Sequence, residues 1–74
     1  MHWLLKQLIY LKPEQRLSFE IVYFDKDITQ PYLRIEMFDR TLNSYEYRDI
    51  KVIDLEFAGD ISFDLIANAI EKLQ

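Results

Sequence analysis

The aspartate-rich segment near residue 25 is the one part of the sequence whose residue types and spacing match an ion-binding motif. Position 6 of an EF-hand calcium loop requires glycine for a sharp turn, but this sequence has Gln30 there, followed by Pro31. The flanking segments also alternate like strands rather than helices. We therefore predict no metal site and no cofactor. The side chains that fit positions 1, 3, 5 and 12 of the loop are Asp25, Asp27, Thr29 and Glu36.

Side chains suited to acid-base or nucleophilic catalysis are sparse. The single histidine, His2, lies at the start of the sequence, where chains commonly fray. Cysteine is absent, and Ser18, Ser44 and Ser62 fall in an expected strand, a turn and a helix start. Hydroxyls in such places usually form local hydrogen bonds. Because no catalytic triad can be assembled, we predict that the protein is not an enzyme.

Paired carboxylates, such as Asp54 with Glu56, could support general acid-base catalysis. However, 13 acidic residues in a chain of 74 produce close pairs by composition alone. We therefore expect these side chains to be solvated. A small metal-assisted enzyme is the third functional hypothesis.

Aromatic and arginine side chains suggest two kinds of binding surface. Nucleic acids bind sheets through exposed rings in a basic groove, whereas protein interfaces favour rings mixed with arginine. The net charge of −4 repels phosphate, and no Lys/Arg-Gly-aromatic signature is present. Single-stranded nucleic-acid binding is therefore the second hypothesis and is not favoured. The side chains concerned are Tyr32, Phe38, Tyr45, Tyr47, Arg34, Arg40 and Arg48.

The length and composition predict one small folded domain covering residues 1–74. Half of the residues are apolar, which is well above the level typical of disordered chains. A core of this size barely offsets the entropy cost of ordering the chain, and no disulfide can contribute. Oligomerisation is the simplest additional source of stability, so we expect a homodimer.

The absence of cysteine fits a reducing compartment, and we expect a cytoplasmic protein. Lys6 and Gln7 interrupt the apolar stretch after Met1, and no small-residue cleavage site follows, so we predict no secretory signal. No segment approaches the 20 or so apolar residues of a membrane span.

Alternating apolar and polar residues predict two strands, over 17–24 and 32–39, joined by a turn through 25–30. After a turn at 41–44, Tyr45 and Tyr47 begin a third strand. The apolar alternation then changes phase near Arg48, which predicts either a β-bulge with one bent strand or a break between two strands.

A helix is predicted over 61–73, with Gly59 ending the preceding segment and Asp60 or Ser62 capping the first turn. The first dozen residues fit either a helix or a further strand. Leucine, lysine and glutamine favour the helix, whereas a turn with Pro13 at its second position would join a strand to the next one.

Together these elements predict an α+β fold, namely an antiparallel meander of three or four strands packed by a C-terminal helix and flanked by the N-terminal segment. Leu33, Ile35 and Met37 are assigned to the helix-covered core, so the opposite strand face carries rings among charges. We expect this face either to bind a partner or a second copy, or to be covered by the N-terminal segment. The preferred function is a non-enzymatic protein-interaction module, such as a small regulator, inhibitor or accessory subunit. Its expected interaction face is Glu20, Val22, Phe24, Tyr32, Arg34, Glu36 and Phe38.

Overall fold

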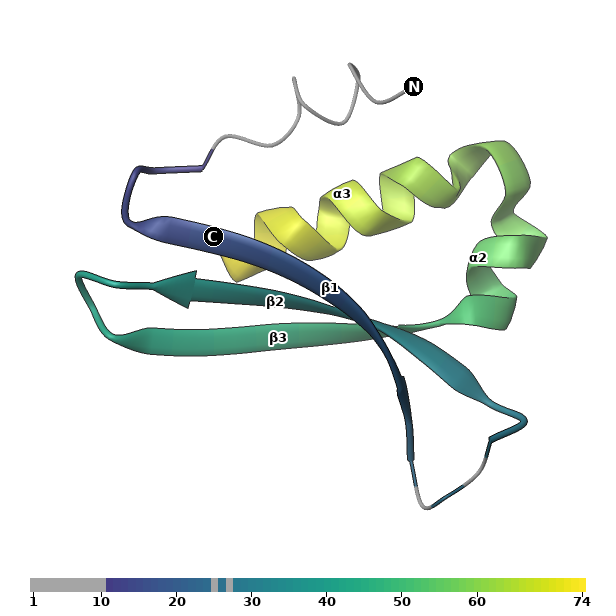
Figure 1. Cartoon of the computed structure of the whole chain (residues 1–74). Coiled ribbons are helices and arrows are strands. Elements are labelled where there is room, and N and C mark those ends of the chain that lie inside the picture. The colour runs from purple at the N-terminus through teal and green to yellow at the C-terminus, as the bar shows by residue number, and fades with distance from the viewer. Residues whose placement is uncertain (1–10, 25, 27) are drawn as a thin grey trace.

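Three antiparallel strands in the order β1-β2-β3 form one sheet, followed by helices at the C-terminal end (Figure 1). The strands span Gln15–Tyr23 (β1), Pro31–Asp39 (β2) and Ser44–Lys51 (β3). This computed structural model describes residues 11–24, 26 and 28–74. It confirms the predicted α+β meander packed by a C-terminal helix. The helix or strand expected over the first dozen residues lies outside the described part of the chain for residues 1–10, and residues 11 and 12 are in neither a helix nor a strand.

Two turns fix the ends of the strands. The Gln15 amide donates to the Lys12 carbonyl at 2.9 Å, closing a turn with Pro13 at its second position, where its fixed φ is favourable. Between β2 and β3, Asn43 adopts a positive φ of 50°, a conformation that asparagine tolerates better than most residues. The Asp39 carboxylate accepts the backbone amides of Thr41 and Leu42 at 2.9 and 3.1 Å and so holds this turn together.

Helix α2 spans Val52–Ala58, a 3₁₀ turn η1 spans Gly59–Ile61, and helix α3 spans Ser62–Leu73. Gly59 ends α2 with a φ of 56°, which a residue without Cβ adopts at little cost. Among the described residues, no helix is long and apolar enough to cross a membrane.

The predicted bulge or break near Arg48 was wrong. β3 pairs with β2 without interruption, from Asp39 opposite Ser44 to Tyr32 opposite Lys51. The tyrosines of β3 face outward and Ile50 faces the helices, so the alternation does not slip. The predicted phase change comes from counting the tyrosines and Ile50 as one apolar series. No fourth strand follows, because residues 52–58 form α2 instead, with Val52, Leu55 and Ala58 half-buried at helical spacing.

The predicted side-chain cap of the last helix was also wrong. α3 begins at Ser62 after Ile61, and no side-chain hydrogen bond caps it. The 3₁₀ turn already runs into the helix, and the Ser62 amide donates to the Gly59 carbonyl. The backbone therefore satisfies this amide without help from a side chain.

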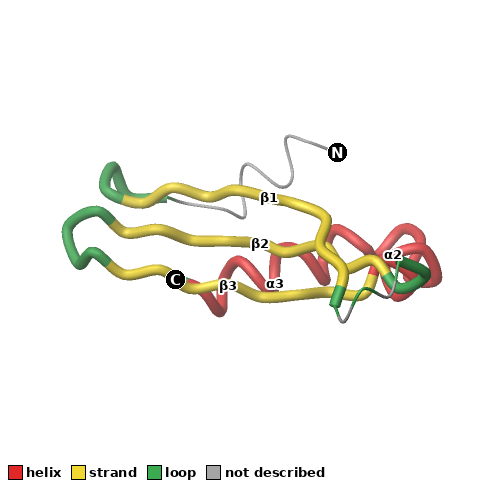
Figure 2. Tube along the Cα trace, turned by 60° about the horizontal axis from the view of Figure 1, so that its bottom comes forward, coloured by secondary structure: helices red, strands yellow, loops and turns green. Residues whose placement is uncertain are grey.

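The core lies between α3 and the middle of the sheet. Ile35 on β2 and Ile70 on α3 are fully buried. α3 contacts β2 and β3, and Figure 2 shows it running along these two strands while β1 forms the far edge of the sheet. The helix side of β1 therefore remains partly exposed. The buried cluster is Ile35, Met37, Ala69, Ile70 and Leu73.

Candidate interaction face

The side of the sheet opposite α3, called the open face below, collects the residues that the sequence analysis selected. Residues directly opposite each other in a sheet share a face, and alternate residues along a strand change faces. The register puts Val22 opposite Tyr32 and Glu20 opposite Arg34, on the side away from Ile35. The strand residues of the open face are Arg16, Ser18, Glu20, Val22, Tyr32, Arg34, Glu36, Phe38, Tyr45, Tyr47, Asp49 and Lys51.

All seven selected residues belong to this face. Six lie on β1 and β2, and Phe24 follows the end of β1. Its ring contacts Tyr32 edge-on, with centroids 4.9 Å apart. The structure therefore brings the selected residues together. It also adds four residues of β3 that the sequence analysis had not included in the face, namely Tyr45, Tyr47, Asp49 and Lys51.

Arg34 occupies the centre of the open face and links β2 to β3. Its Nε and Nη2 donate to the two carboxylate oxygens of Asp49 at 2.9 and 3.0 Å, a bidentate pair. The guanidinium also lies 4.1 Å from the centroid of the Tyr47 ring and 5.6 Å from that of Phe24. Asp49 raises the pKa of Arg34 above its ordinary value, mainly through this hydrogen bonding. The planar cation is thus held rigidly between aromatic rings.

Glu36 links all three strands two residues further along β2. It accepts a hydrogen bond from the Tyr45 hydroxyl on β3 and one from the Ser18 hydroxyl on β1, the latter at 3.1 Å. Both bonds lower the pKa of Glu36, with the larger effect from Tyr45. The same bond to Glu36 raises the pKa of Tyr45. At neutral pH the face therefore holds a carboxylate that accepts from two neutral hydroxyls.

Several rings of the open face remain accessible despite these contacts. Tyr45 and Tyr47 are 53% and 49% exposed, and Phe24 is also exposed. Tyr32 and Phe38 are half-buried among their neighbours. Because their neighbours restrict the motion of these rings, ordering them in a complex would cost little entropy.

The charges of the open face are balanced. Arg16, Arg34 and Lys51 stand against Glu20, Glu36 and Asp49. The other two arginines considered as phosphate contacts lie elsewhere, since Arg48 is opposite Ile35 on the helix side and Arg40 follows the end of β2. The central cation, Arg34, is already paired with Asp49.

The groups considered for catalysis are separated or engaged in structural contacts. Asp54 and Glu56 lie two residues apart on α2, a spacing that does not put them on one helix face. Ser18 donates to Glu36, and Ser62 is the first residue of α3.

The calcium-loop match is not assembled in the described chain either. Glu36 lies inside β2 rather than at the end of a loop, while Asp25 and Asp27 are outside the described residues. Within that description, no cluster of three His, Cys, Asp or Glu side chains could hold a metal ion.

A hollow of about 300 Å³ lies on the other side of the sheet, between the β2–β3 turn and the end of α3. Asp39, Glu46 and Lys72 are its charged lining residues. The Asp39 carboxylate already accepts two backbone amides there. Its described lining residues include no aromatic ring, unlike the open face.

Sequence reasoning missed two features of this region. Tyr45 and Tyr47 share the face that carries Arg34, because the register sets them opposite Phe38 and Glu36. Strict alternation from Tyr45 to Asp49 could have revealed it. The exposure of Phe19 and Ile21 on the helix side of β1 depends on where α3 packs, and the strand pattern carries no signal for it.

The fold and the open face define a class of small α+β domain in which one side of a meander is packed by helices and the other carries rings among balanced charges. Comparisons with models of known protein families, with curated proteins and with solved structures gave no significant match.

Proposed function

We propose that this protein is a non-enzymatic interaction module, such as a small regulator, inhibitor or accessory subunit, whose open face binds another protein. The observation that carries the proposal is the position of Arg34, stacked 4.1 Å from the Tyr47 ring and fixed by two hydrogen bonds to Asp49. Tyrosine and arginine, together with tryptophan, are the side chains enriched at the energetic centres of protein interfaces. On the open face Tyr47 is exposed and Arg34 is half-buried, and the hydrogen bonds to Asp49 fix the orientation of Arg34.

Charge balance supports a protein partner. Three acidic and three basic side chains alternate over the open face, so a partner surface can match them with a mixed pattern of its own. Polar groups such as Ser18 and Asp49 are engaged with neighbours in the chain, which supports a surface that recognises shape rather than one that performs chemistry.

Single-stranded nucleic acid is the second candidate because four rings lie on one face. Tyr32, Phe38, Tyr45 and Tyr47 could stack bases. Such binding depends on unpaired cations that contact phosphate. Arg34 is neutralised by Asp49, and Glu36 lies beside it on the strand, so this candidate remains second.

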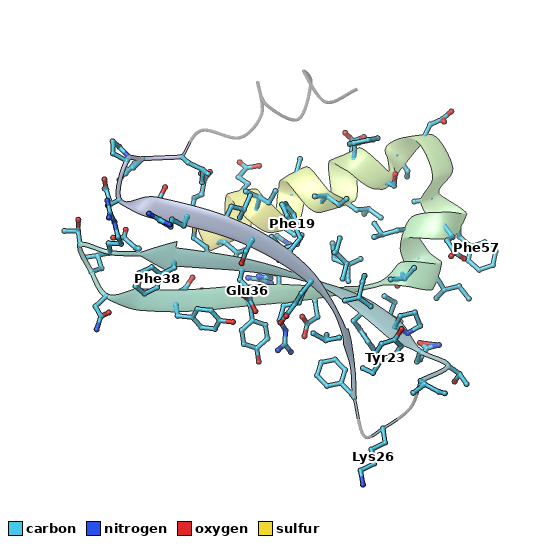
Figure 3. All side chains as sticks on the ribbon, viewed as in Figure 1. Phe19, Tyr23, Lys26, Glu36, Phe38 and Phe57 are labelled. Atoms are coloured by element: carbon cyan, nitrogen blue, oxygen red, sulfur yellow. The ribbon has the colours of Figure 1, made fainter. Side chains whose placement is uncertain are left out.

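A photocrosslinking amino acid placed at Tyr47 in the source cell tests the proposal. We expect light to attach a different protein to the chain at this position. A matched control variant carries the same group at Phe57, which is 83% exposed and points away from the sheet (Figure 3), and should give no such adduct. Adducts to nucleic acid at Tyr47, or equal adducts at both positions, would reject a protein-binding open face.

A second measurement separates binding from folding. The double substitution Tyr32→Ser with Phe38→Ser should reduce capture of the crosslinked partner while the chain stays folded. Loss of folding instead would mean that these rings belong to the core. Binding of a fluorescent oligonucleotide that weakens steeply with salt would favour the nucleic-acid candidate.

The homodimer and the cytoplasmic location also remain proposals. The small buried core, with five buried apolar side chains among the described residues, supports added stabilisation by self-association. The absence of cysteine supports a reducing compartment.

A further inference from the structure

The outer edge of β1 carries backbone groups directed away from the sheet. The Arg40 amide donates to the Glu14 carbonyl at 2.9 Å, and these residues continue the register that puts Gln15 opposite Asp39. In an antiparallel pair, alternate residues bond to the partner strand. The even residues of β1 therefore bond to β2, and the odd residues direct their amides and carbonyls outward. In the described part of the chain, no strand lies beyond β1 in the sheet.

Among the described residues, this edge lacks several of the features with which proteins usually prevent strand pairing. Protected edges are short, bulged, or interrupted by proline, lysine or inward-pointing charges. β1 has nine residues, contains neither proline nor lysine, and pairs with β2 without a bulge. Its charged residues, Arg16 and Glu20, lie on the open face, so the helix side of the strand has no charge at all.

The helix side of β1 carries large apolar side chains beyond the reach of α3. Phe19 and Ile21 are 48% and 52% exposed, although Phe19 lies directly opposite the fully buried Ile35. Figure 3 shows Phe19 on the side of β1 that faces α3. Since α3 contacts β2 and β3, the row on β1 is left at the margin of the core. A neighbouring strand would place side chains against this row.

We propose that two copies of this chain pair antiparallel along their β1 edges, with Phe19 of one copy opposite Phe19 of the second copy. Phe19 is the middle residue of Gln15–Tyr23, so this register pairs the whole strand. It also matches an outward-directed residue with an outward-directed residue, as hydrogen bonding requires. Leu17 then lies opposite Ile21 of the second copy, and apolar side chains meet on the helix side.

The charges on the open face favour the same register. Ser18 lies opposite Glu20 of the second copy, and Arg16 lies diagonal to that carboxylate, within reach of a long side chain. Moving the symmetry axis one residue towards the C-terminus would set Glu20 against Glu20, a like-charge contact. Moving it one residue towards the N-terminus would leave Val22 and Tyr23 outside the paired length. A second copy therefore complements this edge along its full length.

The symmetry axis of such a pair is perpendicular to the sheet, so equivalent faces of the two copies lie on the same side of the joined sheet. The dimer would form one six-stranded sheet with both α3 helices on one side and both open faces on the other. The inference uses the edge of β1 and not the open face, so it does not depend on the proposed binding of another protein.

Disulfide formation at a single introduced cysteine tests the register. Directly opposite residues in a hydrogen-bonded antiparallel pair have Cα atoms about 5.5 Å apart, inside the range that a disulfide spans. The sequence has no cysteine, so Phe19→Cys introduces the only thiol. Under mild oxidation we expect a disulfide-linked species of twice 9.0 kDa. The control Phe57→Cys, at an exposed position of α2 away from the β1 edge, should form no intermolecular disulfide under the same conditions. Cross-linking of Phe19→Cys no faster than that of the control would overturn the proposal.

Sedimentation equilibrium of the unmodified chain provides the second test. We expect a dimer at tens of micromolar and a folded monomer after Phe19→Lys, because a charge in the apolar row would face its counterpart in the second copy. Phe57→Lys should remain dimeric. A wild-type monomer up to several hundred micromolar would overturn the proposal. Destabilisation by Phe19→Lys without a change in mass would likewise overturn it, by showing that the row is covered within one chain.

Discussion

Arg34 and Asp49 lie directly opposite each other on β2 and β3 and are joined by two parallel hydrogen bonds of 2.9 and 3.0 Å. Their side chains keep only 19% and 18% of their surface exposed. A cross-strand pair with this geometry ties the central strand to its neighbour and orients the guanidinium for stacking on Tyr47. The pair therefore contributes to both the stability and the shape of the open face.

Replacing Asp49 with alanine should lower the melting temperature by several degrees, because Arg34 would keep its partly buried charge without its carboxylate. Asp49→Asn should lower it less, since the amide oxygen still accepts one hydrogen bond. Thermal unfolding followed by circular dichroism measures both. Glu56→Gln removes one acidic charge at an exposed position of α2 and serves as the control. Equal melting temperatures for Asp49→Ala and the control would show that the ion pair does not stabilise the fold.

Truncating Ile35 should destabilise the protein more than any exposed substitution. This side chain is fully buried between β2 and α3, so Ile35→Ala removes apolar contacts and leaves a cavity at a cost of about 2 to 5 kcal/mol. Ile28→Ala, at a position 78% exposed, should change the free energy of unfolding by no more than about 0.5 kcal/mol. Urea denaturation compares the two. Similar losses for both variants would mean that the core is not centred on Ile35.

The turn between β2 and β3 should depend on the buried carboxylate of Asp39. Asp39→Ala leaves the amides of Thr41 and Leu42 without their acceptor, at a cost of about 1 to 3 kcal/mol. Asp39→Asn retains an acceptor oxygen and should cost less. Amide hydrogen exchange should accelerate at residues 41 and 42 in the alanine variant. Unchanged exchange at these two amides would contradict this role.

The stability contributed by Glu36 should depend on pH. Hydrogen bonds from Tyr45 and Ser18 lower the pKa of Glu36 in the folded state below the ordinary 4.5. Its contribution is therefore fully present above pH 4.5 and is lost as the pH falls through the folded-state pKa. The free energy of unfolding of wild type should exceed that of Glu36→Gln at pH 7, and this difference should shrink in acid. A difference that is constant from pH 7 to pH 3 would contradict the prediction.

Tyr45→Phe provides the matched control for the pH dependence. It removes the hydroxyl with the larger effect on Glu36, so the pKa of Glu36 should rise towards its ordinary value. Carboxyl carbon shifts measured by NMR against pH report this directly. A pKa of Glu36 unchanged by Tyr45→Phe would show that this hydroxyl does not lower it.

The local elements of the fold could be predicted from the sequence because each depends on nearby residues. Alternation around Leu33, Ile35 and Met37 gave β2 within one residue of its observed start. The 61–73 prediction for the last helix matches Ser62–Leu73 closely. Both patterns reflect burial on one side, which repeats every two residues in a strand and every 3.6 in a helix.

The prediction from sequence was wrong where aromatic or apolar side chains face away from the core. Tyr45 and Tyr47 are large rings that face away from the helices, so counting them in one apolar series with Ile50 predicts a phase change that the register does not contain. The alternative with a fourth strand extends the alternation through Ile53, Leu55 and Phe57. In α2, Ile53 and Phe57 are exposed, and the half-buried residues follow helical spacing.

The sequence by itself determined the α+β class, the first two strands and the composition of the face that carries Arg34, because side-chain alternation assigns residues to faces independently of distant parts of the chain. Only the tertiary structure decided that Asp49 lies opposite Arg34, since strand register depends on how the β2–β3 turn closes. It also decided that α3 packs on β2 and β3 and leaves Phe19 at the edge. The position of a helix across a sheet depends on how side chains from separate segments interlock, and no local pattern encodes that fit.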